Sequence, residues 1–251
     1  MIQYMTRLRG KYMGVYSNIE IKQAIIDGVI VSVPYDKSHV SEASLDFTLG
    51  HNFYKQEFLD SARVYNPFDK DEVNRYFKGP LTAIPHKQWC KENGYKLFAN
   101  VPPDHPVIVL RPGERILAHT HEFIGIRASG GACEVKSRSS WGRNGVAVCF
   151  DAGWVDPGYI NRLTLEIYNL NQHESVVLPV GERIGQLIFH KTGPVDGDYS
   201  DGRNGVSGKY QHTNDLDELI RTWSPDQMLP RAYKDKRQSP VIIKGLSKGT
   251  K

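Results

Sequence analysis

The stretch that decides the fold runs from residue 107 to residue 190 and reads VIVLRPGERILAHTHEFIGIRASGGACEVKSRSSWGRNGVAVCFDAGWVDPGYINRLTLEIYNLNQHESVVLPVGERIGQLIFH. Short apolar runs alternate in it with turn residues every 8–12 residues or so, which is typical of an all-β sandwich or barrel. A near-repeat, PGERI at 112–116 and VGERI at 180–184, lies between two apolar runs at both places. Two equivalent hairpins at the ends of one block favour a jelly roll or a double-stranded β-helix. The expected strands are Val107–Leu110, Arg115–Thr120, Phe123–Arg127, Ala132–Lys136, Gly145–Phe150, Arg162–Asn169, Ser175–Leu178 and Arg183–His190.

The segment before this block predicts a helix followed by two strands. Ser17 with Glu20 three residues later forms a capping box, and Gly28 stands where the end of a helix favours glycine. The β-branched run Val29–Val33 predicts a strand, and so does Ser44–Leu49, in which outward and inward residues alternate.

Residues 60–105 are polar, aromatic and rich in proline, which predicts an insertion of loops and short helices. The two helical candidates are Asp71–Phe77 and His86–Asn93. The sequence assigns this insertion no role.

After residue 191 the strand pattern ends. Residues 193–208 predict a loop, and Asp215–Trp223 predicts a short helix capped by Thr213 or Asn214. We therefore expect one domain over residues 1–224, which contains the 60–105 insertion, and a basic tail over residues 225–251.

Length and composition fit a globular protein of one large or two small domains. The 251 residues are 39% apolar and 24% charged, and the mean hydropathy is −0.46. No apolar run approaches the roughly 20 residues of a membrane helix, and Met1–Tyr16 lacks the apolar core of a secretory signal. Three scattered cysteines, Cys90, Cys133 and Cys149, do not make a disulfide framework. We expect a cytoplasmic protein without a membrane partner.

The net charge of +4 lies in the tail. Residues 225–251 carry seven basic and two acidic side chains, so the rest of the chain has a net charge of −1. A body without excess positive charge is not a binding surface for phosphate backbones. The basic tail suits a solvated extension or a nucleic-acid arm; we favour the solvated extension and expect no nucleic-acid partner.

The sequence argues against a zinc site and against a cysteine nucleophile. A zinc deaminase needs a C-x-x-C pair, which is missing here. His119 and His121 share one face of a strand but lack further ligands in a metal-site pattern, so a surface pair is the favoured interpretation. Cys149 lies in an apolar run and is interpreted as a buried hydrophobe.

The richest region runs from Lys136 to Asn169. KSRSSWGR at 136–143 puts three hydroxyls and three cations into eight residues, which suits a polyphosphate or a solvated turn. In 162–169 the apolar and polar residues alternate, so Glu166 lies on the polar face in mid-strand. Such a glutamate either faces solvent or faces a pocket or subunit interface, where a raised pKa suits a general acid/base.

These residues carry a resemblance to a known family. RSSWGR at 138–143, AGWVDPG at 152–158, TLE at 164–166 and RIGQL at 183–187 together resemble the dCTP deaminase branch of the dUTPase-like superfamily. The resemblance extends more weakly to Ile19–Gly50 and to GKYQ at 208–211. It does not cover residues 60–105 or those after about 225.

The resemblance implies a fold, an assembly and a reaction. The fold is mainly β, a distorted jelly roll or β-barrel with a few short helices, and the assembly is a homotrimer with active sites between subunits. The reaction is the hydrolytic deamination of dCTP to dUTP and ammonia without zinc. Mg²⁺ enters with the triphosphate.

The resemblance also implies roles for individual residues. Glu166 is the general acid/base, Ser139 and the carbonyl of Ala152 position the water, and Arg143 lies beside the reaction centre. The substrate-binding residues by this resemblance are Arg138, Ser140, Asp156, Thr164, Leu165, Gln186, Lys209 and Tyr210.

Three functions remain open at this stage. Glu166 and the Ser139-Ser140-x-x-Arg143 pattern favour a dCTP deaminase over a plain dUTPase. AGW at 152–154 resembles the bifunctional members that also cleave dUTP to dUMP and pyrophosphate. A non-catalytic nucleotide-binding trimer is the third reading, because Thr213 stands where the family commonly has a glutamine.

Overall fold

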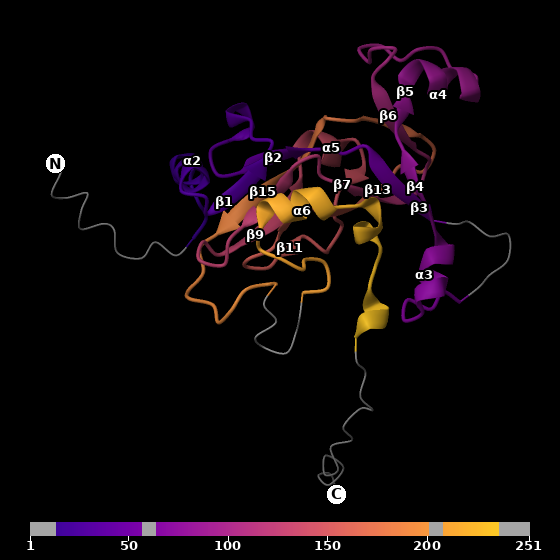
Figure 1. Ribbon diagram of the computed structural model, residues 1–251. Coiled ribbons are helices and arrows are strands. Elements are labelled where there is room, and N and C mark those ends of the chain that lie inside the picture. The colour runs from indigo at the N-terminus through magenta and orange to yellow at the C-terminus, as the bar shows by residue number, and fades with distance from the viewer. Residues whose placement is uncertain (1–13, 57–63, 201–207, 236–251) are drawn as a thin grey trace, which may run out of the picture.

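The computed structural model describes residues 14–56, 64–200 and 208–235, and this part of the chain is mainly β (Figure 1). Its strands form antiparallel sheets joined by short helices and loops, as the sequence predicts. The first sheet has the order β1 (Ile30–Val33), β8 (Phe123–Ile126), β12 (Ile160–Asn161), and the second β10 (Val146–Ala147), β13 (Thr164–Asn169), β7 (Arg115–His119), β3 (Asn52–Gln56), β4 (Phe77–Thr82). The third has the order β11 (Trp154–Val155), β9 (Ala132–Ser137), β15 (Arg183–His190), β2 (Leu45–Thr48), and the fourth β14 (Val176–Pro179), β6 (Pro106–Leu110), β5 (Ile84–Pro85).

Strand β13 shows why the apolar alternation produces this core. Leu165 and Ile167 are fully buried in the main hydrophobic cluster, whereas Thr164, Glu166 and Tyr168 are only partly buried on the opposite face. Because successive side chains of a strand point to opposite faces, one strand supplies both the core and a polar surface.

The near-repeat forms two equivalent turns, but the expected hairpins are wrong, because in both places the two flanking strands belong to different sheets and do not pair with each other. PGERI leads from β6 into β7 and VGERI leads from β14 into β15, while β6 and β14 pair with each other. Gly113 and Gly181 adopt φ angles of 69° and 78°. Glycine suits both positions because a side chain makes this left-handed backbone costly.

The N-terminal helix α2 (Asn18–Ile26) has the predicted capping box. The Ser17 side chain accepts a hydrogen bond from the Glu20 amide, and the Glu20 carboxylate accepts one from the Ser17 amide at 3.0 Å. Gly28 follows the helix end with φ 69°. The helix buries Ile21 and Ala24. Among the described residues no helix is long and apolar enough to cross a membrane.

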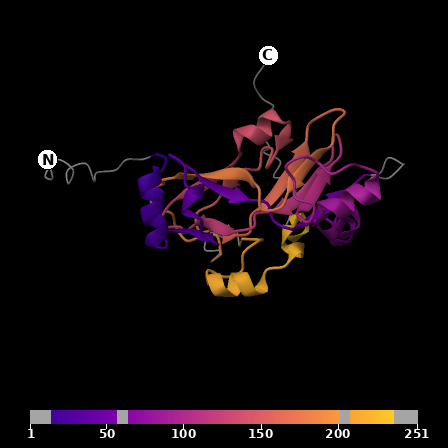
Figure 2. The same cartoon turned by 90° about the horizontal axis from the view of Figure 1, so that it is seen from above.

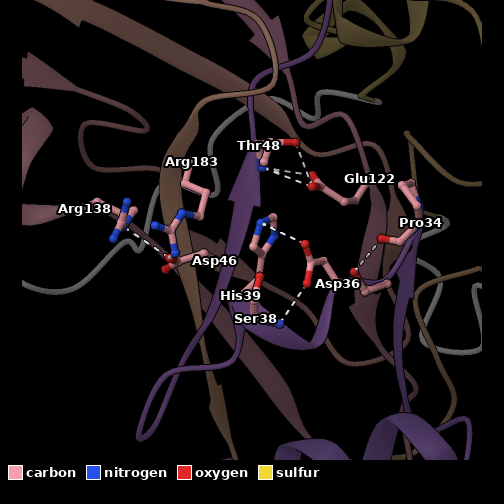
Figure 3. Close-up of polar contacts among 10 residues, drawn as sticks. Pro34, Asp36, Ser38, His39, Asp46, Thr48, Glu122, Arg138 and Arg183 are labelled. Atoms are coloured by element: carbon pink, nitrogen blue, oxygen red, sulfur yellow. Dashed lines mark hydrogen bonds and ion pairs between the residues drawn. The ribbon is translucent and has the colours of Figure 1, made fainter.

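The predicted alternation of Ser44–Leu49 is wrong, since all four residues of β2 are buried. Asp46 and Thr48 are buried because each has charged or polar partners from segments distant in the sequence (Figure 3). The predicted strand Gly145–Phe150 shrinks to the two residues of β10. A helix, α5 (Ser139–Arg143), forms directly after β9.

The insertion contains more regular structure than loops and helices. Helices α3 (Lys70–Tyr76) and α4 (His86–Asn93) form where the sequence predicts them, but β4 and β5 were not predicted. Strand β4 extends the second sheet by pairing with β3. The insertion is therefore built into the sheet system, and α4 projects from it with β5 and β6 (Figure 1).

The C-terminal part packs on the sheets further than expected. Helix α6 (Leu216–Thr222) is capped by Asp215, not by Thr213 or Asn214. Residues 225–235 form two short 3₁₀ helices, η2 (Pro225–Met228) and η3 (Ala232–Lys234), and Met228 is buried. Residues 225–235 are therefore not part of a solvated tail, and the rest of the expected tail, residues 236–251, lies outside the described residues.

Candidate active site

A pocket of about 320 Å³ lies beside β13 and β11 under the C-terminal segment. Five residues that the sequence singled out line it: Ala152, Asp156, Thr164, Glu166 and Tyr210. They come from the loops on either side of β11, from β13 and from a segment after residue 207, so only the folded chain brings them together.

Glu166 provides one of the two carboxyl groups that line the pocket. It pairs with Leu117 of β7 across the second sheet, and Leu117 also lines the pocket. Burial raises the pKa of the Glu166 carboxyl to about 7, although its own amide and the Arg115 guanidinium act in the opposite direction. A carboxyl that titrates near neutral pH can both accept and return a proton, which is what a general acid/base does.

Asp156 presents a second carboxyl to the same pocket. Its backbone carbonyl accepts a hydrogen bond from the Tyr159 amide at 3.1 Å, which closes the Asp-Pro-Gly turn. Trp154 Nε1 donates a hydrogen bond to Asp156 Oδ1 at 3.2 Å. The Trp154 indole is 57% exposed, so it holds the carboxylate while its ring borders the pocket opening.

Three tyrosines make one side of the pocket aromatic. Tyr159 and Tyr199 meet edge to face with ring centroids 4.7 Å apart, and burial raises the pKa of both phenols. Tyr210 completes the group. Tyr199 was not predicted as a site residue, because it lies in a segment with no strand or helix pattern.

Cys149 also lines the pocket, and its Sγ donates to the Val135 carbonyl oxygen at 3.3 Å. Burial raises the pKa of this thiol to about 11, so it is a thiol at neutral pH and not a nucleophile. The expectation of a buried hydrophobe is confirmed.

A second group of expected site residues lies elsewhere on the chain. Arg138 precedes α5, and Ser139, Ser140 and Arg143 are exposed on it. None of the four lines the pocket. Figure 2 shows α5 and α6 on opposite sides of the sheets. A single chain therefore does not unite the α5 residues with Glu166.

Arg138 takes part in an ion-pair cluster shown in Figure 3. Its Nε lies 3.2 Å from Asp46 Oδ2, and Arg183 Nη1 lies 3.4 Å from the same oxygen. Asp46 is only 3% exposed, so the two guanidiniums compensate a buried carboxylate. Gln186 is near this cluster on β15, where its Oε1 accepts a hydrogen bond from Ser44 Oγ at 3.2 Å.

The remaining expected residues have other surroundings. Lys209 Nζ pairs with Asp235 Oδ1 at 2.6 Å. The Leu165 side chain is fully buried in the core, so only its backbone can border a ligand. Gln211 is buried because its Oε1 accepts from the Ile160 amide at 2.7 Å.

The interpretation of His119 as part of a surface pair is wrong. Its ring is 1% exposed, lies 4.7 Å from the Trp223 ring and accepts a hydrogen bond from the Asn52 amide at Nε2. Burial lowers its pKa to about 4. Within the described ranges, no three His, Cys, Asp or Glu side chains are grouped so that they could hold a metal ion.

The chain is similar to proteins of one known family. A family model described as dCTP deaminase-like matches residues 15–192. A protein of Methanopyrus kandleri named "dCTP deaminase, dUMP-forming" is 33% identical over 203 residues, which cover 79% of this chain and 91% of that protein.

Two further relatives have similar coverage. The Nanoarchaeum equitans protein of the same name is 30% identical over 76% of this chain and 89% of its own length. A Haloarcula marismortui protein named "dCTP deaminase" is 31% identical over 78% of this chain and 89% of its own length. With most of the chain matched, the chain belongs to the dCTP deaminase family.

Proposed function

We propose that this protein deaminates dCTP and then cleaves the resulting dUTP, so that it releases ammonia, dUMP and pyrophosphate. The observation that carries the deamination is the Glu166 carboxyl, which lines the pocket and whose pKa is raised to about 7. The names of two relatives, which call them dUMP-forming, support the second step.

In the first step Glu166 moves the protons. Its carboxylate takes a proton from water as the water oxygen bonds to C4 of the cytosine ring, and it passes that proton to the ring N3. The second water proton goes to the amino group, which leaves as ammonia when the C4–N bond breaks. dCTP and water thus become dUTP and ammonia, and Glu166 ends as a carboxylate again.

In the second step water attacks the α-phosphorus of dUTP, the bond to the bridging oxygen breaks, and pyrophosphate leaves. The resemblance assigns the sugar 3′-hydroxyl to Asp156, whose carboxylate Trp154 orients. It assigns the phosphates to Arg138, Ser139, Ser140, Gln186, Lys209 and Tyr210. AGW at 152–154 supports the bifunctional reading.

The complete site then needs two subunits of a homotrimer. Glu166, Asp156, Thr164 and Ala152 line the pocket of one chain, whereas the exposed Ser139 and Arg143 lie on α5, away from it. A neighbouring chain would bring its α5 to this pocket. The Ser139 hydroxyl would then position the water, and the Arg143 guanidinium would stabilise the charge that develops at the ring.

Mg²⁺ is proposed to enter with the triphosphate, and water activation is assigned to Glu166 instead of zinc. The test uses two chelators. We expect EDTA to stop turnover and excess Mg²⁺ to restore it, while a zinc-selective chelator in Mg²⁺ buffer leaves the rate unchanged. Loss of activity with the zinc chelator alone would refute the zinc-free reaction.

Product analysis tests the function itself. Purified protein with dCTP and Mg²⁺ should release ammonia and pyrophosphate in equal amounts and form dUMP, and Glu166→Gln should abolish ammonia release. Accumulation of intact dUTP would leave a deaminase alone, as the name of the Haloarcula marismortui relative has it. Tight dCTP binding without ammonia would mean a non-catalytic nucleotide-binding protein.

Mixing two inactive variants tests the shared site. If Glu166 and Arg143 come from different subunits, co-expressed Glu166→Gln and Arg143→Ala chains restore about a quarter of the sites, because both intact residues meet at random. Mixtures that stay inactive although the chains co-assemble would place both residues in one subunit.

A further inference from the structure

The insertion and the C-terminal segment meet in a small hydrophobic cluster separate from the main core. We call it the lateral cluster. Its buried members are Tyr54 of β3, Val73 of α3, Phe77 of β4, Leu117 of β7 and Met228 of η2. It joins the two regions that the family resemblance does not cover to two strands of the second sheet.

The lateral cluster touches the pocket directly. Leu117 and Met228 belong to the cluster and also line the pocket, and Pro230 lines it two residues further on. Leu117 is also the strand partner of Glu166. Apolar side chains from the C-terminal segment thus lie in the same cavity as the carboxyl.

Polar contacts hold this segment in place beyond Met228. The Arg231 amide donates to the Tyr210 hydroxyl at 3.1 Å, and Arg231 Nη1 donates to the Lys209 carbonyl at 2.7 Å. The Arg231 guanidinium also lies 5.5 Å from the Tyr210 ring centroid. The segment is therefore tied to the cluster at one end and to the pocket's own Tyr210 at the other.

We propose that residues 228–231, seated on the insertion through the lateral cluster, form a wall that keeps water away from Glu166, with Met228 as its positioning residue. The inference rests on the proposed function for its catalytic meaning. It gives the insertion and the start of the C-terminal segment a shared role in the reaction, although residues 225–235 lie beyond the family match.

Removing apolar area from one side of a carboxyl lets solvent reach it, which favours its charged form and lowers its pKa. We expect the other groups near Glu166 to stay in place when Met228 is shortened. The titratable and charged groups are Arg115 of β7, Cys149 after β10, Asp156 after β11, and Tyr159, Tyr199 and Tyr210 of the pocket. A change at Met228 therefore reports on the wall.

Activity against pH gives the first test. Met228→Ala should move the acidic limb of the kcat/KM profile to lower pH by about one unit and lower the maximum about tenfold. Val73→Ala, in the same cluster but not in the pocket, is the matched control, and its limb should not move. Met228→Leu, which keeps the apolar volume, should restore the profile. Equal profiles for Met228→Ala and Val73→Ala would overturn the proposal.

A second test does not depend on catalysis. Glu166→Gln should raise the Tm more at pH 8 than at pH 5. This difference between the two pH values should shrink when Met228→Ala is also present and should persist when Val73→Ala is present instead. If the difference in Tm gain between pH 8 and pH 5 is unchanged in both backgrounds, the proposed wall is refuted even if the enzyme is active. A reduced gain in a protein that releases no ammonia would retain the wall and refute the proposed function.

Discussion

Replacing Glu166 with glutamine should make the protein more stable, and more so as the pH rises. Burial raises the pKa of this carboxyl from the usual 4.5 to about 7 in the folded chain. Between these two values the folded state binds more protons at Glu166 than the unfolded state does. Stability therefore falls with rising pH through this window, and the glutamine variant escapes that fall.

The size of the effect follows from the shift. A rise of about 2.5 pKa units corresponds to about 3 kcal/mol between the two ends of the window, as an upper estimate because the side chain keeps some contact with water. The stabilisation by glutamine should be small at pH 5 and reach about 2–3 kcal/mol at pH 8, or about 5–10 °C in Tm for a chain of this size.

Thermal and urea unfolding at both pH values, at one protein concentration, measure the effect. The exposed Glu182→Gln variant controls for replacing a carboxyl with an amide. The reasoning is refuted if Glu166→Gln changes stability equally at pH 5 and pH 8, because the carboxyl would then not be desolvated in the folded protein.

Three further changes test the packing around the sheets. Ser17→Ala removes the cap of α2 and should cost about 1 kcal/mol in urea unfolding, whereas no loss would mean that the cap is dispensable. Gly125→Ala puts a Cβ 2.1 Å from the Tyr159 carbonyl oxygen, so we expect a loss of about 3 kcal/mol; wild-type stability would show that the strands can separate there. Glu122→Gln weakens a buried carboxylate that accepts bonds from the Thr48 amide and hydroxyl at 3.0 and 2.7 Å. It should cost about 2 kcal/mol by calorimetry, and an unchanged Tm would contradict this.

The local sequence largely determines where the strands form. β13 and β15 form where apolar and polar residues alternate, and Ser17 and Gly28 bound α2 as their types predict. These features depend on neighbours within a few residues, so periodicity and capping are enough to find them. β10 is shorter than predicted because an apolar run alone does not provide a pairing partner.

Buried polar residues could not be predicted in the same way. Asp46 and His119 look like surface residues by type, yet each is buried among partners that are distant in sequence. Arg138, for example, lies some ninety positions from Asp46 along the printed sequence. Only the register of the sheets brings such groups together.

The sequence by itself determined the family, the mainly β fold and the choice of Glu166, because these depend on residue types at fixed spacings along the chain. Only the tertiary structure decided that Glu166 lies in a pocket with a raised pKa, that the α5 residues lie away from this pocket, and that Met228 lines it. The physical reason is that burial depends on which segments meet in space. The insertion and the C-terminal segment meet over β7, although more than a hundred residues separate Phe77 from Met228.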